Sequence, residues 1–192
     1  MKPERMNAFS DGVLAILITI LVLELRPPPG HHLSDVLHEK GKLLAYGLSF
    51  VMVGIYWNNH HHLMSIVEKI DGRTLWANMH LLFWLSLMPL GTAWLGEAGV
   101  QTGPTAAYAI ILLGCAIAFT LLTLSLLTLH ETGSQLEQAI GRDRKGKISL
   151  AAYVLSLAFA FFLPWVSIGL FVFVAIVWFV PDRRVERVLG AA

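Results

Sequence analysis

The sequence predicts an all-α integral membrane protein with six membrane-spanning helices. Apolar residues make up 56% of its 192 residues and charged residues only 14%, and the mean hydropathy is +0.65. Soluble domains carry about 25% charged residues, so the composition excludes that class. Uncharged runs of membrane-spanning length recur along the chain, and we therefore treat residues 1–192 as a single transmembrane domain.

The first span is expected at residues 6–25. Twelve uncharged residues separate Asp11 from Glu24, fewer than the roughly 20 that cross the hydrocarbon. The helix must therefore start near Met6, which places the Asp11 carboxylate inside the span, where it needs a partner or a proton. The alternative is that Asp11 is only the N-cap of a shorter helix.

The next three spans are expected at residues 43–66, 74–96 and 105–129. The second ends in an unusual Trp-Asn-Asn-His-His-His run at residues 57–62. The third carries Asn78 and His80, and the fourth carries the single cysteine of the chain, so an internal disulfide is excluded. Short helical segments are expected in the connections, at residues 34–40 and 135–140.

The last uncharged run, residues 148–181, is too long for one crossing. As a single helix its 34 residues would be about 51 Å long, against about 30 Å of hydrocarbon. Pro164 lies in the middle of the run and breaks a helix interior. We therefore predict two short spans at residues 148–163 and 166–181.

The distribution of Lys and Arg predicts the orientation. With six spans, one side of the membrane holds both termini and eleven of the fourteen Lys and Arg residues, and the other side holds only Arg26, Lys40 and Lys42. Basic residues concentrate in cytoplasmic loops. The sequence therefore predicts a multi-pass protein of the cell (plasma or inner) membrane with both termini in the cytoplasm.

The first span presents two distinct faces on a helical wheel. At about 100° per residue, one face holds Phe9, Gly12, Ile16, Ile20 and Leu23 within roughly 40° of a common line, with Thr19 on its flank. The other holds Asp11, Ala15, Ile18 and Val22 and is expected to turn toward the helices of its own chain. Either both faces pack in a bundle, or the first lines a pore that several subunits share and that apolar side chains gate by dewetting.

The sequence lacks the characteristic motifs of several functional classes. The sequence holds no Thr-Val-Gly-Tyr-Gly filter of the usual potassium channels, no Gly-rich phosphate loop and no nucleophile elbow. We therefore expect no enzyme activity, no cofactor, no metal and no nucleic-acid partner.

Motifs in the first three spans resemble one known family. They are Arg5-x-x-x-Phe9-Ser10-Asp11 in the first span, Trp57-x-x-His60-His61 in the second, and Asn78, Leu82-Phe83 and Leu87-Met88-Pro89-x-x-Thr92 in the third. This pattern is similar to that of the prokaryotic members of the transmembrane protein 175 family, and the similarity covers nearly the whole six-span layout.

The resemblance implies a potassium-permeable cation channel that lacks the usual filter. It implies a homotetramer in the lipid bilayer, with K+ as the permeant ion and the first span of each subunit lining a central pore. The tightest apolar ring then falls on Ile16, and further pore positions fall on Thr19, Ile20 and Leu23. A polar network implied by the family would involve Arg5, Phe9, Ser10, Asp11, Trp57, His60, His61 and Asn78.

Two other functions stay open at this point. His60, His61, His62 and His80 are candidate ligands of a metal site, as in a metal transporter or a metal-dependent membrane protein. However, three consecutive histidines on a helix cannot all face one ion. Proton conduction is the other alternative, since Asp11 and the histidines titrate, although the pore face itself holds no ionisable side chain.

Overall fold

The computed structural model describes residues 2–28, 30–131, 134–140 and 143–179, and these form helices and connecting segments without a strand. The long helices are α1 (Glu4–Leu23), α3 (Lys40–Ser65), α4 (Gly72–Ser86), α5 (Met88–Ala98), α6 (Thr102–Leu129), α8 (Arg144–Ala160) and α9 (Pro164–Phe179). Two short helices, α2 (Leu33–His38) and α7 (Gln135–Ile140), lie in the connections.

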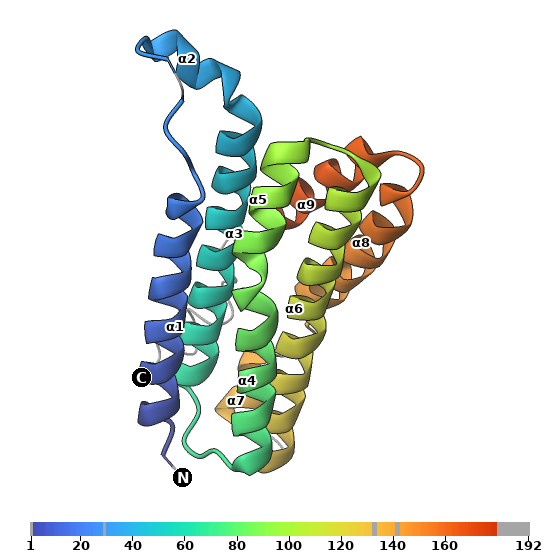
Figure 1. The fold of residues 1–192 in the computed structure, drawn as a ribbon. Helices are drawn as coiled ribbons and strands as arrows, with labels where there is room; N and C mark the ends of the chain where they lie inside the picture. Colours follow the sequence, from blue (N-terminus) through green and yellow to red (C-terminus); the bar gives the residue numbers. More distant parts are fainter. Residues whose placement is uncertain (1, 29, 132–133, 141–142, 180–192) are drawn as a thin grey trace.

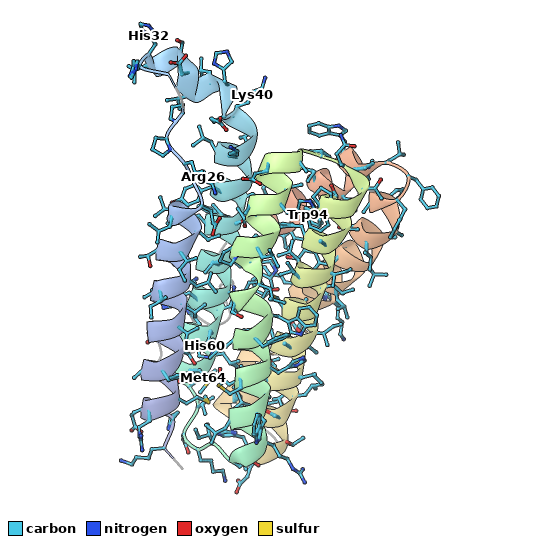
Figure 2. All side chains as sticks on the ribbon, in the orientation of Figure 1. Arg26, His32, Lys40, His60, Met64 and Trp94 are labelled. Atoms are coloured by element: carbon cyan, nitrogen blue, oxygen red, sulfur yellow. The ribbon has the colours of Figure 1, made fainter. Side chains whose placement is uncertain are left out.

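The long helices form an antiparallel bundle with α1 at one edge. In Figure 1, α1, α3, the α4–α5 pair and α6 alternate in direction, and α8 and α9 pack on the side away from α1. The α2 segment projects at one end of the bundle. In Figure 2, Arg26, His32 and Lys40 lie toward that end, whereas His60 and Met64 lie toward the end where the chain begins.

Helix α1 is covered on one side only. Its buried residues are Met6, Ser10, Leu14, Leu17 and Leu21, a spacing of three and four that marks a single helical stripe. The stripe packs against α3, α4 and α5. The remaining surface of α1 is largely exposed, so the chain leaves most of this helix free for other contacts.

The expected third span consists of two helices. Helix α4 ends at Ser86 and α5 begins at Met88, and the N–H of Leu87 bonds to the carbonyl of Trp84 at 3.2 Å instead of continuing the α-helical pattern. Pro89 has no N–H and its ring crowds the preceding turn, which accounts for the break. Figure 1 shows the two helices following nearly the same line.

The break in the last uncharged run lies at Pro164. Helix α8 ends at Ala160, and α9 starts at Pro164 itself. A proline suits the first position of a helix because its missing N–H would have no intrahelical partner there.

Three parts of the described chain are long and apolar enough to cross a membrane. They are Glu4–Leu23, the α4–α5 pair Gly72–Ala98, and Thr102–Leu129, and Pro164–Phe179 is a shorter apolar helix. Helix α3 has 26 residues, sufficient length for a crossing, but its Asn and His residues near the end lower its hydropathy. Helix α8 starts with three cations, at Arg144, Lys145 and Lys147.

A buried hydroxyl cluster joins α3, α5 and α6. Ser49 Oγ lies 2.8 Å from Tyr108 Oη and 2.6 Å from Thr92 Oγ1, and Thr92 Oγ1 lies 2.7 Å from the carbonyl oxygen of Met88. All three hydroxyl side chains are buried. Buried hydroxyls are costly unless they are hydrogen-bonded, so this cluster fixes how the three helices pack against one another.

Candidate pore helix and polar network

The face of α1 that the sequence singled out is left uncovered by the rest of the chain. Ile16 is 61% exposed, Ile20 39% and Leu23 77%, and Thr19 is exposed as well. Branched apolar side chains in this number are unsuited to water. They need lipid, another subunit or a dewetted pore around them.

Thr19 is the only polar side chain among these four positions. Its hydroxyl donates to the carbonyl of Ile16 at 2.7 Å. A hydroxyl has one proton and two lone pairs, so this bond uses the proton and leaves the oxygen as an acceptor or as a ligand for a cation.

The prediction for the other face of α1 is wrong in part. Ala15 and Val22 are exposed and Ile18 is half-buried, whereas the stripe that faces the chain's own helices runs through Ser10, Leu14, Leu17 and Leu21. Apolar residues surround α1 on all sides, and a helical wheel gives only relative angles. The wheel therefore could not show which third of the helix is buried.

A buried hydrogen-bonded chain links α1, α4 and α3. Ser10 Oγ donates to the carbonyl of Met6 at 2.9 Å, Asn78 Nδ2 donates to Ser10 Oγ at 2.9 Å, and Asn78 Oδ1 lies 2.8 Å from His60 Nε2. Ser10, Asn78 and His60 are at most 2% exposed. They are therefore held together inside the protein.

The hydrogen bonds among Ser10, Asn78 and His60 determine which atom carries each shared proton. The single proton of Ser10 goes to Met6, so Ser10 must accept from the amide nitrogen of Asn78. The amide oxygen then faces His60, and because an amide oxygen only accepts, His60 Nε2 carries the proton. Of the two neutral tautomers of His60, the network thus selects the one protonated at Nε2.

A second, exposed layer lies beside the buried chain. Trp57 Nε1 donates to Asp11 Oδ1 at 3.0 Å, and the His61 ring stacks on Trp57 with centroids 5.8 Å apart and an interplanar angle of 24°. The Asp11 carboxylate therefore has a partner on α3. The alternative that Asp11 is a helix N-cap is wrong, because α1 begins at Glu4, two turns earlier.

The histidine run separates into three environments. His60 is buried and bonded to Asn78, His61 is exposed on Trp57, and Nε2 of His62 lies 3.1 Å from Oδ1 of Asn58 on the same helix. His80 instead accepts from the indole of Trp84 at 2.9 Å. Within the part of the chain that the structure describes, no three His, Cys, Asp or Glu residues could hold a metal ion together.

Two predicted network residues are not brought into these bonds. Arg5 lies exposed in the first turn of α1, and no hydrogen bond or ion pair of its guanidinium is found among the described residues. Phe9 is 52% exposed. Within one chain, both side chains thus lie on the uncovered surface of α1.

Sequence reasoning missed two polar contacts inside the bundle. One is the Ser49–Thr92–Tyr108 cluster, of which only Thr92 was noted as part of a motif. The other is the bond between His80 and Trp84, which lie four residues apart on α4. The available signal was the presence of hydroxyl and imidazole groups inside otherwise apolar spans, where such groups require partners.

Comparison with known proteins decides the family. The sequence profile of a family described as the endosomal/lysosomal potassium channel TMEM175 matches residues 5–89. Over 189 residues, 98% of both chains, the sequence is 48% identical to a protein of Chryseobacterium sp. named a potassium channel. The chain belongs to the TMEM175 family.

Further TMEM175 relatives extend the comparison. A potassium channel of Chamaesiphon minutus is 32% identical over 178 residues, 86% of this chain and 87% of its own. The crystal structure of a lysosomal potassium-selective channel TMEM175 homolog from the same organism superposes with a TM-score of 0.76 at 29% identity, covering 91% of this chain and 95% of the other. The chicken endosomal/lysosomal proton channel TMEM175 is 35% identical over 102 residues, only 20% of its length.

The family assignment confirms the resemblance seen in the sequence. TMEM175 proteins are ion channels and not enzymes, and they are multi-pass membrane proteins with the all-helical fold described above. The matched region contains α1 from Arg5 onward, all of α3 with the second-span motif, and all of α4. The uncovered face of α1 and the Ser10–Asn78–His60 chain therefore lie in the part of the sequence that the family shares.

Proposed function

We propose that this protein is a potassium-permeable cation channel in which α1 of four identical subunits lines a central pore. The observation that carries the proposal is the uncovered face of α1, which presents Ile16, Ile20 and Leu23 and lies in the region that matches the family. The names of the bacterial relatives support K+ as the permeant ion. Six spans per subunit, near residues 6–25, 43–66, 74–96, 105–129, 148–163 and 166–181, complete the proposed architecture.

The narrowest part of the proposed pore is a ring of four Ile16 side chains. A pore constricted by branched apolar groups excludes water when it is narrow and conducts when it widens or wets. Ile20 and Leu23 follow one and two turns further along the helix and would continue the apolar wall. The gate is thus a matter of pore radius and wetting, and it requires no charged plug.

Thr19 is the proposed source of ion selectivity. The chain has no Thr-Val-Gly-Tyr-Gly filter, so a cage of backbone carbonyls of that kind is not available. Because the Thr19 proton is bonded to Ile16, four Thr19 oxygens would face a passing cation with free lone pairs. Oxygen ligands of low field strength favour K+ over Na+ only moderately.

The polar network holds the pore helix in place. Ser10 lies six residues before Ile16, about 9 Å along the helix axis, and it is tied to α4 and α3 through Asn78 and His60. Asp11 adds the bond to Trp57. The position of the Ile16 ring therefore depends on these contacts, and we assign Arg5, Phe9 and His61 to the same network in the assembled channel.

The proposed orientation places both termini in the cytoplasm. The end of the molecule near α2 carries Arg26 and Lys40 (Figure 2) and, with Lys42, holds three of the fourteen cations of the sequence. The six-span layout assigns the other eleven to the opposite side of the membrane. In a bacterial cell this corresponds to the inner membrane.

Proton conduction is the second candidate, because the animal relatives are named proton channels. The proposed pore face holds no ionisable side chain, so protons would have to move along water in a wetted pore. The two functions are separated by placing vesicles in a more acidic external solution without K+. A proton channel then acidifies the vesicle lumen, and a potassium channel does not.

Cation flux from liposomes tests the proposal. Purified protein is reconstituted and loaded with K+ or with Na+, and efflux is compared between the wild type and Thr19→Val, which keeps the side-chain shape and removes the oxygen. We expect faster K+ than Na+ efflux in the wild type and a smaller ratio in the variant. Absence of efflux for both cations from a correctly assembled tetramer would contradict the proposed function.

A further inference from the structure

A narrow cavity lies inside the bundle, away from the proposed pore helix. Figure 1 shows α8 and α9 on the side of the bundle away from α1, and the cavity lies where these two helices meet α3 and α6. Helix α1 contributes no residue to the lining, so the cavity is separate from the proposed pore face. Most of the lining is apolar or aromatic, with side chains that include Met52, Tyr56, Ala116, Phe119, Tyr153 and Trp178.

The two ends of the cavity differ in polarity. Met52 and Asn59, both in the lining, are seven residues apart on α3, which corresponds to about 10 Å along the helix axis. At the Met52 end, Tyr153 of α8 donates to Sδ of Met52 at 3.8 Å. Because α8 runs in the opposite direction to α3, its N-cap Asp143 lies toward Asn59. The cavity therefore has one apolar end and one polar end.

The polar end offers more acceptors than donors. Thr120 Oγ1 donates its proton to a carbonyl of its own helix at 2.8 Å. Asn59 uses one N–H of its amide on the carbonyl of Ile55 at 2.7 Å, and Asp143 accepts from the N–H of Gly146 with one of its two oxygens. In the described part of the chain, these three side chains keep acceptor oxygens and a single amide N–H for a ligand. A hydroxyl group, which both donates and accepts, suits this set.

The charges around the cavity disfavour an ionic ligand of either sign. Asp143 is the charged residue of the lining, and it is followed in the first turn of α8 by three cations, Arg144, Lys145 and Lys147. Glu131 and Glu137, in the connection before α8, do not line the cavity. A cationic ligand would meet this excess of positive charge. An anion would lie beside the Asp143 carboxylate with one free N–H to bind it.

The volume of the cavity, about 50 Å³, limits the ligand to a few atoms. A cavity of roughly 150 Å³ in a protein core holds benzene, so an aromatic ring is too large here. We propose that the cavity binds a short, linear, neutral alcohol of about three carbons. Its hydroxyl lies toward Asn59 and Asp143, and its alkyl chain lies against Met52 and Phe119. This site does not depend on the assignment of the pore.

Nuclear magnetic resonance of methionine methyl groups tests the binding directly. Protein with isotope-labelled methionine methyl groups is titrated with n-propanol in detergent micelles, and Met52→Leu assigns the Met52 signal. Met52 is 1% exposed and lines the cavity, whereas Met88 is 0% exposed on α5 and lies outside the lining. We expect a saturable shift of Met52 alone, half-complete at millimolar alcohol, as for a ligand of this size. No shift, a linear shift at Met52, or the same shift at Met88 would contradict a specific site.

Three variants separate the cavity from general solvent effects. Ala116→Leu fills the cavity and should abolish the saturable shift, while an unchanged Met88 signal shows that the variant is folded. Ala151→Leu makes the same change at an exposed position of α8 outside the lining and should bind like the wild type. Asn59→Leu removes the amide and should weaken binding about fivefold, as for one neutral hydrogen bond. A saturable shift that persists in Ala116→Leu would exclude the cavity as the binding site.

Charged analogues of the same length test the preference for a neutral ligand. The n-propylammonium ion and propionate replace the hydroxyl end by a cation or an anion. Neither should shift the Met52 signal at concentrations at which n-propanol saturates it. Binding of either ion as tight as that of the alcohol would overturn the proposal. Since no flux is measured, failure of this site would leave the channel proposal intact.

Discussion

Asn78 and Ser10 lie 68 positions apart in the sequence, and the amide nitrogen of Asn78 donates to the Ser10 hydroxyl at 2.9 Å. The other end of the same amide lies 2.8 Å from His60 Nε2. One side chain of α4 therefore holds both the proposed pore helix and the helix behind it. The stability of the pore wall depends on this amide.

Replacing Asn78 by leucine should destabilise the protein. The variant keeps a similar volume but leaves the His60 N–H buried without an acceptor, which costs about 1–3 kcal/mol. Thermal unfolding in detergent measures the loss. His60→Leu combined with Asn78→Leu should cost less than the sum of the two single changes, and strictly additive losses would contradict the coupling.

The Asp11–Trp57 bond should couple α1 to α3. Trp57→Phe keeps an aromatic ring under His61 but removes the indole donor, and Asp11→Asn weakens the acceptor. Because both changes remove the same bond, the double variant should be little worse than either single variant, with a coupling of about 1 kcal/mol. A double-mutant cycle on unfolding free energies measures this coupling, and independent effects would exclude the bond.

The packing of Trp84 on Gly114 should make that glycine hard to replace. A Cβ at Gly114 would overlap the indole ring of Trp84, and His80 holds the ring by its bond to the indole N–H. Gly114→Ala should cost about 1–3 kcal/mol through overpacking between α4 and α6. Gly47→Ala is the control, because a Cβ there meets nothing within 4 Å. Equal stability of the two variants would contradict the contact.

Asp71 should make stability depend on pH at the start of α4. The backbone N–H of Thr74, followed by its hydroxyl, lowers the pKa of the Asp71 carboxyl below its ordinary value. A carboxyl whose folded pKa is depressed stabilises the fold above its unfolded pKa, and this contribution is lost as the pH falls below about 4. Unfolding temperatures of wild type and Asp71→Asn should therefore converge in acid. If the two unfolding temperatures differ by the same amount at every pH, the hydrogen bonds from Thr74 to Asp71 do not stabilise the start of α4.

The sequence predicts the helices well where a single local signal decides. Pro164 divides the last uncharged run as expected, and the short helix α7 occupies the expected residues 135–140. The break at Leu87 was not anticipated. Pro89 lies close to the start of α5, where proline is also tolerated. Only the structure shows that the helix is interrupted in the turn before this proline.

The candidate site could be predicted only as a set of residue types. The motifs name Ser10, Asp11, Trp57, His60 and Asn78, and the structure joins them in two separate layers. The pairing of Asn78 with Ser10 and His60 depends on how three helices cross, which no local pattern contains. Helical spacing also leaves the absolute rotation of α1 undetermined, so the inward stripe through Leu14 and Leu17 had to come from the structure.

The central claim is that Ile16 lines the pore, and the most direct measurement is K+ efflux from liposomes containing Ile16→Asn. A polar ring at the constriction should hold water and raise the efflux well above that of the wild type. Val22→Asn is the matched control, because Val22 is 46% exposed on α1 but lies outside the proposed pore face. Increased efflux for Ile16→Asn alone supports the account, whereas unchanged efflux for Ile16→Asn, or an equal rise for Val22→Asn, contradicts it.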